Sequence, residues 1–182
     1  MLADIENASG GMDMHALFST CDLCDAHRDA LHTDALRVLP PVFRSFGKIS
    51  RFRGKIATVQ CHDDNALVRA TLESAGMARV LVVDGAASMK RALLGGNLAA
   101  LASQNGWAGV LVNGCVRDVH EILQVPIGVL ALASMPAPPE KHGKGRVDAV
   151  VTIQDVIVRP GEWLYADEDG VIISREQLGL AL

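Results

Sequence analysis

The segment "RVLVVDGAASMKRALLGGNLAALASQNGWAGVLVNGCVRDV", residues 79–119, determines the architecture of this chain. Its two ends, "RVLVVDG" and "GVLVNGCV", are short continuous apolar runs, which are typical of strands buried on both faces. Between them, "NLAALASQNGW" has apolar residues at helical spacing, with a start near Asn97 and a stop at Asn105-Gly106. The order strand, helix, strand predicts that the two strands pair in parallel.

The flanking sequence extends this pattern in both directions. We expect helices over 21–31, 65–76 and 88–94, strands over 55–61 and 127–133, and a proline-rich loop over 134–146. After the loop come short β-rich pieces, which are punctuated by Pro160-Gly161 and by Asp169-Gly170, the latter a strong hairpin signal. The sequence therefore predicts an α/β domain with an additional β layer.

Composition limits the size of the fold and the classes of function. The 182 residues suffice for one domain, and 49% of them are hydrophobic while 21% are charged, which favours a well-packed core that also buries surface against copies of itself. The net charge of −4 argues against a nucleic-acid binder, which needs a concentrated basic field. The N-terminus lacks a secretory h-region, and the longest apolar run, 125–135, falls short of the roughly 20 residues that cross a bilayer. We expect a soluble cytoplasmic protein without a membrane partner.

Without an export signal, the four cysteines are expected to be reduced thiols: Cys21, Cys24, Cys61 and Cys115. The C-x-x-C spacing of the first pair admits a zinc or redox site, but no second such pair exists, so two thiols on one helix face is the favoured interpretation. Cys61-His62, next to two aspartates, is a weaker metal candidate because adjacent residues of a strand point to opposite faces.

Gly95-Gly96-Asn97-Leu98 precedes the central helix. Glycines let a backbone approach a ligand closely, and the free amide groups at a helix N-terminus favour an anion such as a carboxylate. The alternative is that the glycine pair ends one helix and that Asn97 caps the next.

Arg117, Asp118 and Glu121 follow the second buried strand, at the carboxyl end where ligands bind in parallel sheets. The two acids are three residues apart, so a helical turn would place both carboxylates on one face, a donor set that suits Mg²⁺ or Mn²⁺ with several retained waters. Arg117 would then stabilise an oxygen that gains negative charge. A capping box with Asp118, or an ion pair between Arg117 and Glu121, explains the same residues without a site.

These residues carry a family resemblance. Together with "LPPVFRSFG" (39–47) and "PGEWLYADEDGVIIS" (160–174), the segment 79–119 resembles the RraA-like family, named for regulator of ribonuclease activity A, which includes metal-dependent 4-hydroxy-4-methyl-2-oxoglutarate aldolases. The resemblance covers residues 18 to 175. It implies a single domain over 1–182 with a three-layer β/β/α, swivelling-domain-like fold, a mixed sheet and a β-rich C-terminal part, preceded by a flexible extension over 1–17.

The resemblance also implies roles for the candidate residues. Family members with lyase activity carry Asp or Gly, then twenty residues, then Arg-Asp, and the Gly version adds a carboxylate after two more; this sequence has Gly96, Arg117-Asp118 and Glu121 at that spacing. The backbone amides of Gly95, Gly96, Asn97 and Leu98 would bind the substrate carboxylate. Arg117 would contact the substrate, and Asp118 would ligate Mg²⁺ or Mn²⁺ with support from Glu121, directly or through water.

The implied substrate is an α-keto acid. Cleavage of 4-hydroxy-4-methyl-2-oxoglutarate into two pyruvates and decarboxylation of oxaloacetate would share a pyruvate enolate, with His120 as the nearest candidate for the proton carrier. The family further implies a homotrimer or a hexamer with sites near subunit interfaces. Two rivals remain: a non-catalytic protein that inhibits ribonuclease E by binding its regulatory segment, and a structural oligomer with a vestigial site.

Overall fold

The computed structural model describes residues 18–179, so the predicted extension over 1–17 lies outside the described part. Its helices are α1 (Thr20–Ala26), a 3₁₀ turn (Arg28–Ala30), α2 (Ala66–Leu72), α3 (Gly96–Gln104) and α4 (Val119–Ile122). Its strands are β1 (Leu36–Val38), β2 (Arg44–Ser45), β3 (Phe52–Gln60), β4 (Val80–Asp84), β5 (Ala92–Leu94), β6 (Gly109–Val116), β7 (Gly128–Ser134), β8 (Arg146–Val147), β9 (Val151–Ile153), β10 (Val156–Val158), β11 (Trp163–Ala166) and β12 (Val171–Ser174).

The strands form one large mixed sheet and a separate hairpin. The large sheet has the order β1-β12-β11-β3-β4-β6-β7-β2, with β5 paired to β6 and β8 to β3, while β9 and β10 pair with each other. β3, β4, β6 and β7 run parallel, as the strand-helix-strand pattern predicted, and β11, β12 and β1 extend the sheet in antiparallel fashion. The nine-residue β3 joins the two parts, because residues 52–55 pair with β11 and residues 56–60 pair with β4.

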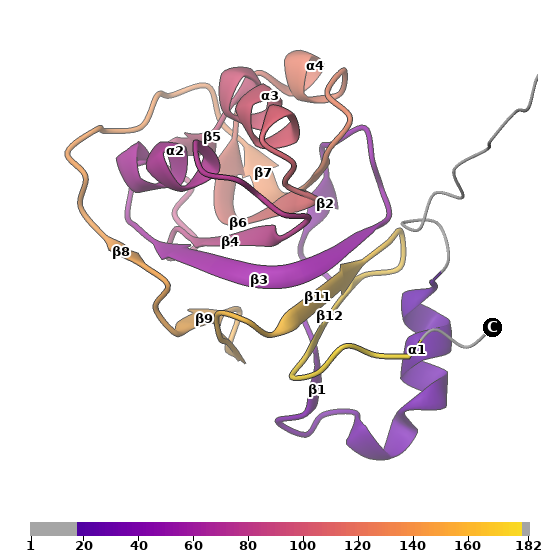
Figure 1. The fold of residues 1–182 in the computed structure, drawn as a ribbon. Coiled ribbons are helices and arrows are strands. Elements are labelled where there is room, and N and C mark those ends of the chain that lie inside the picture. The colour runs from indigo at the N-terminus through magenta and orange to yellow at the C-terminus, as the bar shows by residue number, and fades with distance from the viewer. Residues whose placement is uncertain (1–17, 180–182) are drawn as a thin grey trace, which may run out of the picture.

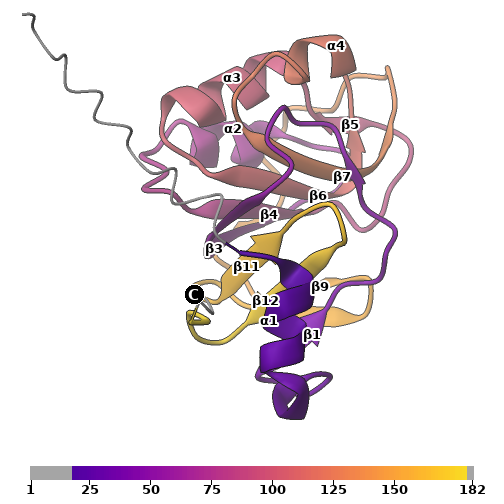
Figure 2. The same ribbon diagram turned by 90° about the vertical axis from the view of Figure 1, so that its right-hand side faces the viewer.

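The parallel strands are buried on both faces, which explains their continuous apolar sequences. Along β4, Leu81 and Val83 pack toward the helices α2, α3 and α4, whereas Val80 and Val82 pack toward β9 to β12. In Figure 1, α2, α3 and α4 lie above the parallel strands, the β-rich C-terminal part lies below them, and α1 lies beside that part; Figure 2 shows the same layers from the side. The predicted three-layer α/β architecture with a mixed sheet is therefore confirmed.

Close packing at the centre depends on two glycines. The ring of Phe52, at the start of β3, lies flat against Gly109 of β6 and Gly128 of β7, and a Cβ at either glycine would collide with the ring. Phe52 is 1% exposed. The aromatic ring therefore closes the lower side of the sheet where the parallel and antiparallel parts meet.

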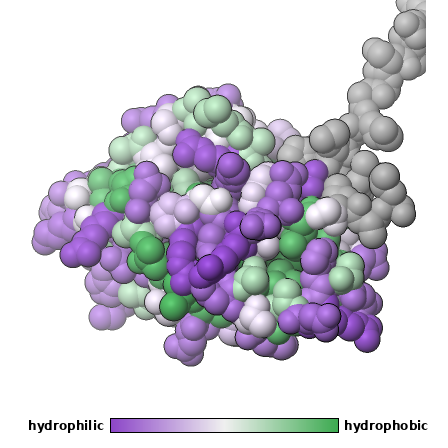
Figure 3. All heavy atoms as spheres, turned by 60° about the horizontal axis from the view of Figure 1, so that its bottom comes forward, coloured by the Kyte–Doolittle hydropathy of each residue, from purple (hydrophilic) through white to green (hydrophobic). Residues whose placement is uncertain are grey.

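The tail contains the predicted hairpin. β11 and β12 pair antiparallel, and Asp169-Gly170 lies in the turn between them. A second hairpin, β9–β10, turns through Gln154 and Asp155, both of which have positive φ. On the underside of the molecule, shown in Figure 3, hydrophobic side chains interrupt the hydrophilic surface. The exposed large apolar side chains near β8 to β10 are Val147, Val150 and Ile157.

Three local predictions were wrong or inexact. Residues 88–94 do not form a helix, because Ala92–Leu94 pair with β6 as the buried strand β5 and the Ala92 amide donates to the Ala137 carbonyl. α3 begins at Gly96 with Gly95 as its N-cap, so Asn97 lies inside the helix. α1 begins at Thr20, after Ser19, whose side chain accepts the Asp22 amide, but it ends at Ala26 instead of residue 31, and the chain continues in a 3₁₀ turn.

Candidate active site

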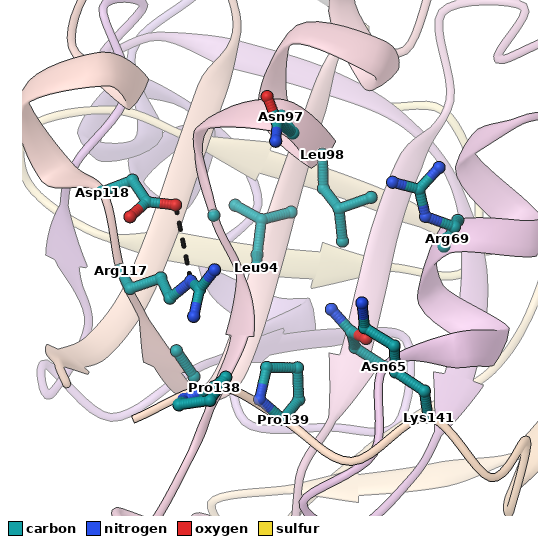
Figure 4. Close-up of a pocket in the computed structure, with 12 residues that line it drawn as sticks. Asn65, Arg69, Leu94, Asn97, Leu98, Arg117, Asp118, Pro138, Pro139 and Lys141 are labelled. Carbon is teal, nitrogen blue, oxygen red and sulfur yellow. Dashed lines mark ion pairs between the residues drawn. The ribbon is translucent and has the colours of Figure 1, made fainter. Parts of the chain in front are cut away.

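A pocket of about 130 Å³ lies at the carboxyl ends of the parallel strands. Figure 4 shows its lining residues, which come from the segments after β3, β5, β6 and β7. Five of the predicted site residues line it: Gly95, Asn97, Leu98, Arg117 and Asp118. The topology therefore places the two sequence clusters beside each other at the edge where parallel sheets bind ligands.

The glycine pair allows the two clusters to touch. A Cβ at Gly95 would lie 2.6 Å from Oδ2 of Asp118, and a Cβ at Gly96 would collide with the Glu121 side chain, whose own Cβ would be 2.6 Å away. Any larger residue at these positions would push the start of α3 away from the segment after β6. The glycines therefore serve close approach of two connections, in addition to ending β5 and capping α3.

Asp118 has an unusual backbone and faces the glycine pair. Its φ of 56° lies in the left-handed region, which is uncommon for a residue with a side chain. Its carboxylate makes no capping hydrogen bond to α4; instead, Oδ2 accepts the Gly96 amide at 3.3 Å and lies 3.4 Å from Nε of Arg117. The capping box is thus not formed, and the Arg117–Glu121 ion pair is absent among residues 18–179.

The amide groups at the start of α3 are not all free. The amides of Leu98 and Ala99 donate to the Gly95 carbonyl, and the Gly96 amide faces Asp118. Within the described residues, the Asn97 amide has no hydrogen-bond acceptor, and Asn97 itself lines the pocket. Fewer amides are therefore available to bind a carboxylate than the four of residues 95–98 that the sequence predicted, since the Leu98 amide already bonds within the first helical turn.

The opposite wall of the pocket was missed by sequence reasoning. Asn65 and Arg69, at the start and in the middle of α2, and Lys141, from the loop after β7, line this side (Figure 4). Asn65 donates to the Leu93 carbonyl at 3.2 Å, and Arg69 donates to Glu73 at 3.3 Å. The position of Asn65 at the start of the predicted helix 65–76, in the connection that follows a buried strand, was the one available signal. We call Asn65, Arg69 and Lys141 the far wall.

The charges of the pocket are strongly biased. Three cationic side chains line it, Arg69, Arg117 and Lys141, against the single carboxylate of Asp118. Arg117 and Asp118 are each about one-third exposed, so water and a small ligand reach them. Such a pocket favours a ligand with more than one negative group.

Three predicted residues lie outside the pocket lining: Gly96, His120 and Glu121. Glu121 is exposed on α4 against Gly96, and His120 is exposed on the same helix. No group of three or more His, Cys, Asp or Glu side chains among residues 18–179 is arranged to hold a metal ion. One carboxylate with a second one nearby still fits a hard cation, because Mg²⁺ uses one or two protein carboxylates and completes its shell with water and substrate oxygens.

The cysteines do not form a second site. Cys21 is exposed on α1, and the neighbouring Asp169 carboxylate raises its pKa, which opposes the thiolate that redox or metal chemistry needs. Burial raises the pKa of Cys24, and burial raises that of Cys61 to about 12. The geometry supports the interpretation of these residues as inert thiols.

Two wider hollows, of about 430 and 650 Å³, lie elsewhere. The first is lined by Arg53, Lys55 and Arg79, but the Arg79 guanidinium donates to the Ala75 and Gly76 carbonyls and stacks on Trp107. The second includes Asp84, whose carboxylate accepts from Gln60, Asn113 and the Ala86 amide. The Arg79 guanidinium and the Asp84 carboxylate are therefore engaged in holding the fold.

Residues 20–173 match the sequence model of the RraA-like family, described as Aldolase/RraA. A protein of Albidiferax ferrireducens named "Putative 4-hydroxy-4-methyl-2-oxoglutarate aldolase" is 54% identical over 169 residues, covering 88% of this chain and 97% of that protein. A Burkholderia mallei protein with the same name is 53% identical over 162 residues, covering 89% and 98%.

Solved structures share the fold under other names. The RNA-processing inhibitor RraA from Thermus thermophilis is 47% identical with a TM-score of 0.83, covering 88% of this chain and 94% of that one. A Geobacillus kaustophilus structure described as an S-adenosylmethionine:2-dimethylmenaquinone methyltransferase is 43% identical with a TM-score of 0.84, covering 88% and 97%. Among residues 18–179, no helix has both the length and the apolar character required to cross a membrane.

Proposed function

The chain belongs to the RraA-like family, and from this premise we propose that it is a divalent-metal-dependent aldolase that cleaves 4-hydroxy-4-methyl-2-oxoglutarate into two pyruvates. Decarboxylation of oxaloacetate would be a side activity of the same site. The observation that carries the proposal is the position of Asp118, which faces the glycine pair beside Arg117 instead of capping α4.

The start of α3 would hold the keto acid. The Asn97 amide, at the positive end of the helix dipole, would bind the C1 carboxylate, and Arg117 would lie beside the C2 oxygen. When the C3–C4 bond breaks, its electron pair moves toward C2 and negative charge gathers on that oxygen. A guanidinium fixed beside this oxygen stabilises the charge as it develops.

The two products account for all atoms of the substrate. The C4 hydroxyl loses its proton and C4 becomes the carbonyl of one pyruvate, while the enolate of the other half gains a proton at C3 and becomes the second pyruvate. Loss of CO₂ from oxaloacetate leaves the same enolate, so one arrangement of Arg117 and the α3 amides would serve both reactions.

Asp118 would hold the divalent cation, with Glu121 as its support through water. When bound, the cation supplies a Lewis acid that lowers the energy of negative charge on the keto oxygen. The Asp118 carboxylate fits this role because, among residues 18–179, it accepts from one amide, at 3.3 Å, and remains about one-third exposed, so it retains lone pairs for a further ligand.

The far wall would bind the second carboxylate of the proposed substrate. The substrate carries one carboxylate at each end, and Arg69 and Lys141 line the side of the pocket opposite Arg117 (Figure 4). We therefore place the C1 carboxylate at α3 and the distal carboxylate toward Arg69 and Lys141.

An assay of pyruvate release tests this proposal. Lactate dehydrogenase and NADH would be coupled to the purified protein with 4-hydroxy-4-methyl-2-oxoglutarate and, separately, oxaloacetate. We expect NADH oxidation with Mg²⁺ or Mn²⁺ and none with EDTA. Absence of pyruvate release with both substrates and both cations would refute the proposal.

A second candidate function has one specific observation in its favour. A relative that is 47% identical carries the name of an RNA-processing inhibitor, so inhibition of ribonuclease E without chemistry is the alternative. It predicts tight binding to the regulatory segment of the ribonuclease and no pyruvate release. Titration of a labelled segment of that kind, alongside the pyruvate assay, separates the two functions.

We also propose that the protein assembles as a homotrimer or as a dimer of trimers. The exposed Val147, Val150 and Ile157 on the underside offer apolar surface for such contacts. A neighbouring subunit would then complete the site with an acid of its own. Light scattering coupled to size-exclusion chromatography tests this, and a monomer at micromolar concentration would contradict it.

A further inference from the structure

Asp64 is a buried carboxylate outside the pocket lining, and the mechanism above leaves it without a role. It is 2% exposed and lies between the end of β3 and the start of α2. Oδ1 accepts the Ala66 amide at 2.9 Å, while Oδ2 accepts the amides of His142 at 2.6 Å and Lys144 at 3.5 Å. One carboxylate thus joins the first turn of α2 to a loop 78 residues further along the chain.

The two joined segments supply the far wall. Asn65 is the N-cap of α2 and Arg69 lies within that helix, while Lys141 directly precedes His142 in the loop. Backbone bonds support the same junction, since the Asn65 amide donates to the Glu140 carbonyl at 3.2 Å and the Glu140 amide to the Asp63 carbonyl at 2.7 Å. The relative position of Arg69 and Lys141 is therefore set where Asp64 lies.

Both ends of this loop have other contacts, since Glu140 bonds to Asp63 and Asn65 and Arg146 pairs with β3, but its middle has few among the described residues. Residues 140–146 are exposed, and Gly143 and Gly145 have positive φ. On its other side, Arg91 donates to the Pro138 carbonyl at 2.8 Å and the Ala92 amide to the Ala137 carbonyl at 3.0 Å, so the part before Lys141 is held independently. Along the chain, Lys141 lies between Pro138, which Arg91 holds, and His142, which Asp64 holds.

The donors around Asp64 favour its ionised form. Burial alone would raise its pKa, but the amides of Ala66, His142, Lys144 and Gly143 outweigh burial and leave the pKa lowered. The carboxylate is thus charged at neutral pH, and charged acceptors make the stronger hydrogen bonds.

We propose that Asp64 is a positioning residue for substrate recognition, because its carboxylate holds α2 and the loop 140–146 at the separation at which Arg69 and Lys141 together bind the distal carboxylate of a dicarboxylic keto acid. This inference rests on the proposed aldolase function for its substrate. The tether between the two segments is independent of that function.

The first test separates binding of the distal carboxylate from chemistry. Asp64→Asn keeps the shape and one acceptor oxygen, whereas Asp64→Ala removes the tether. With 4-hydroxy-4-methyl-2-oxoglutarate, we expect Asp64→Ala to raise KM about 10-fold, Asp64→Asn to raise it less, and kcat to stay within about twofold. Deuterium exchange into the methyl group of pyruvate, which has no distal carboxylate, should remain at the wild-type rate in both variants.

The second test does not need activity. Trypsin cleaves after Lys141, Lys144 and Arg146, and mass spectrometry follows cleavage in this stretch. We expect cleavage to become at least about 10-fold faster in Asp64→Ala, because the tether no longer holds the loop. Glu168→Gln is the matched control: its carboxylate accepts from Ser50 at 2.6 Å and from Arg51 at 3.2 Å, away from the pocket, and it should change neither readout.

The following outcomes would overturn the inference that Asp64 is a positioning residue, or would separate it from the proposed function. An unchanged KM with unchanged cleavage overturns the inference, and so does an equal loss of kcat and of pyruvate exchange, which would indicate a general structural role. Should Asp64→Ala fail to fold, as judged by circular dichroism, the smaller effects of Asp64→Asn decide. If the wild-type protein releases no pyruvate at all, the proposed function fails, and the proteolysis still tells whether Asp64 holds the loop.

Discussion

The two ends of the pocket are assembled in different ways. At one end, Gly95, Gly96, Arg117 and Asp118 come from two consecutive connections around β6, and they meet through a close approach that glycine permits. At the other end, the far wall combines α2 with a loop that follows β7, and a buried carboxylate holds the two together. Under the proposed function, the glycine end would perform the chemistry and the far wall would select the substrate.

The largest expected effect concerns the cation at the glycine end. In Asp118→Asn the only pocket-lining carboxylate is replaced by a neutral amide, so activity should no longer rise when Mg²⁺ or Mn²⁺ is titrated into chelated protein. Pyruvate release during the titration is the measurement. Asp25→Asn, an exposed aspartate paired with Arg28, is the control and should respond to cation as the wild type does. A normal cation response in Asp118→Asn would contradict our assignment.

The next effect concerns charge stabilisation at the same end. Arg117→Ala should lower kcat about 100- to 1000-fold, as expected when a donor to a developing oxyanion is removed, with a smaller change in KM. Steady-state kinetics and the melting temperature together check this, since the fold should remain intact. Arg117→Lys keeps the charge but loses the planar fork and should recover only part of the rate. Near-normal turnover of Arg117→Ala would mean that the chemistry lies elsewhere.

A smaller effect should follow from filling the space between the two connections. In Gly96→Ala, better helix propensity contributes about 1 kcal/mol of stability, but collision with Glu121 costs about 1–3 kcal/mol, so we expect net destabilisation of about 1 kcal/mol and a fall of about 3 °C in Tm. Thermal unfolding measures this. The double variant Gly96→Ala/Glu121→Gly removes the whole Glu121 side chain, Cβ included, so Gly96→Ala should lower Tm no further in a Glu121→Gly background; additive losses in the double variant would show that the contact is not the cause.

The smallest effect should appear at the far wall. Arg69 is exposed and shared with Glu73, so Arg69→Gln should raise KM for the dicarboxylate about 5-fold and leave kcat unchanged. Glu73→Gln is the matched control, since it leaves Arg69 without its helix partner and should lower KM slightly. A kcat defect in Arg69→Gln equal to the KM defect would abolish the proposed distinction between the two ends.

The glycine end was predictable from sequence because its geometry is local. Parallel strands with a helix between them place successive connections at one edge, so Gly95-Gly96 and Arg117-Asp118 were expected to meet. What the sequence left open was the choice between a cap and a site. The left-handed backbone of Asp118 and the direction of its carboxylate depend on packing against Gly95 and Gly96, which no periodicity encodes.

The far wall was not predictable for the opposite reason. Lys141 lies in a proline- and glycine-rich loop without periodicity, and Arg69 reads as one member of an i,i+4 pair with Glu73 on an ordinary helix. The segments that carry them are joined by long-range hydrogen bonds of Asp63, Asp64 and Asn65 to Glu140, His142 and Lys144, which no local pattern encodes. Long-range contacts also explain the wrong prediction over residues 88–94. Their apolar spacing favours a helix, but Ala92–Leu94 form a fully buried strand because they pair with β6.

The double pairing of β3 has a consequence for how the molecule comes apart. The continuous strand β3 belongs to both the parallel and the antiparallel parts of the sheet. Its first residue, Phe52, also packs its ring against Gly109 and Gly128 where the two parts meet. Neither part can therefore unfold while the other stays folded. Native-state amide exchange should then find the backbone of β3 opening only in global unfolding, together with β4 and β11. Damage that opens the antiparallel layer would therefore also disrupt the pocket at the carboxyl ends of the parallel strands.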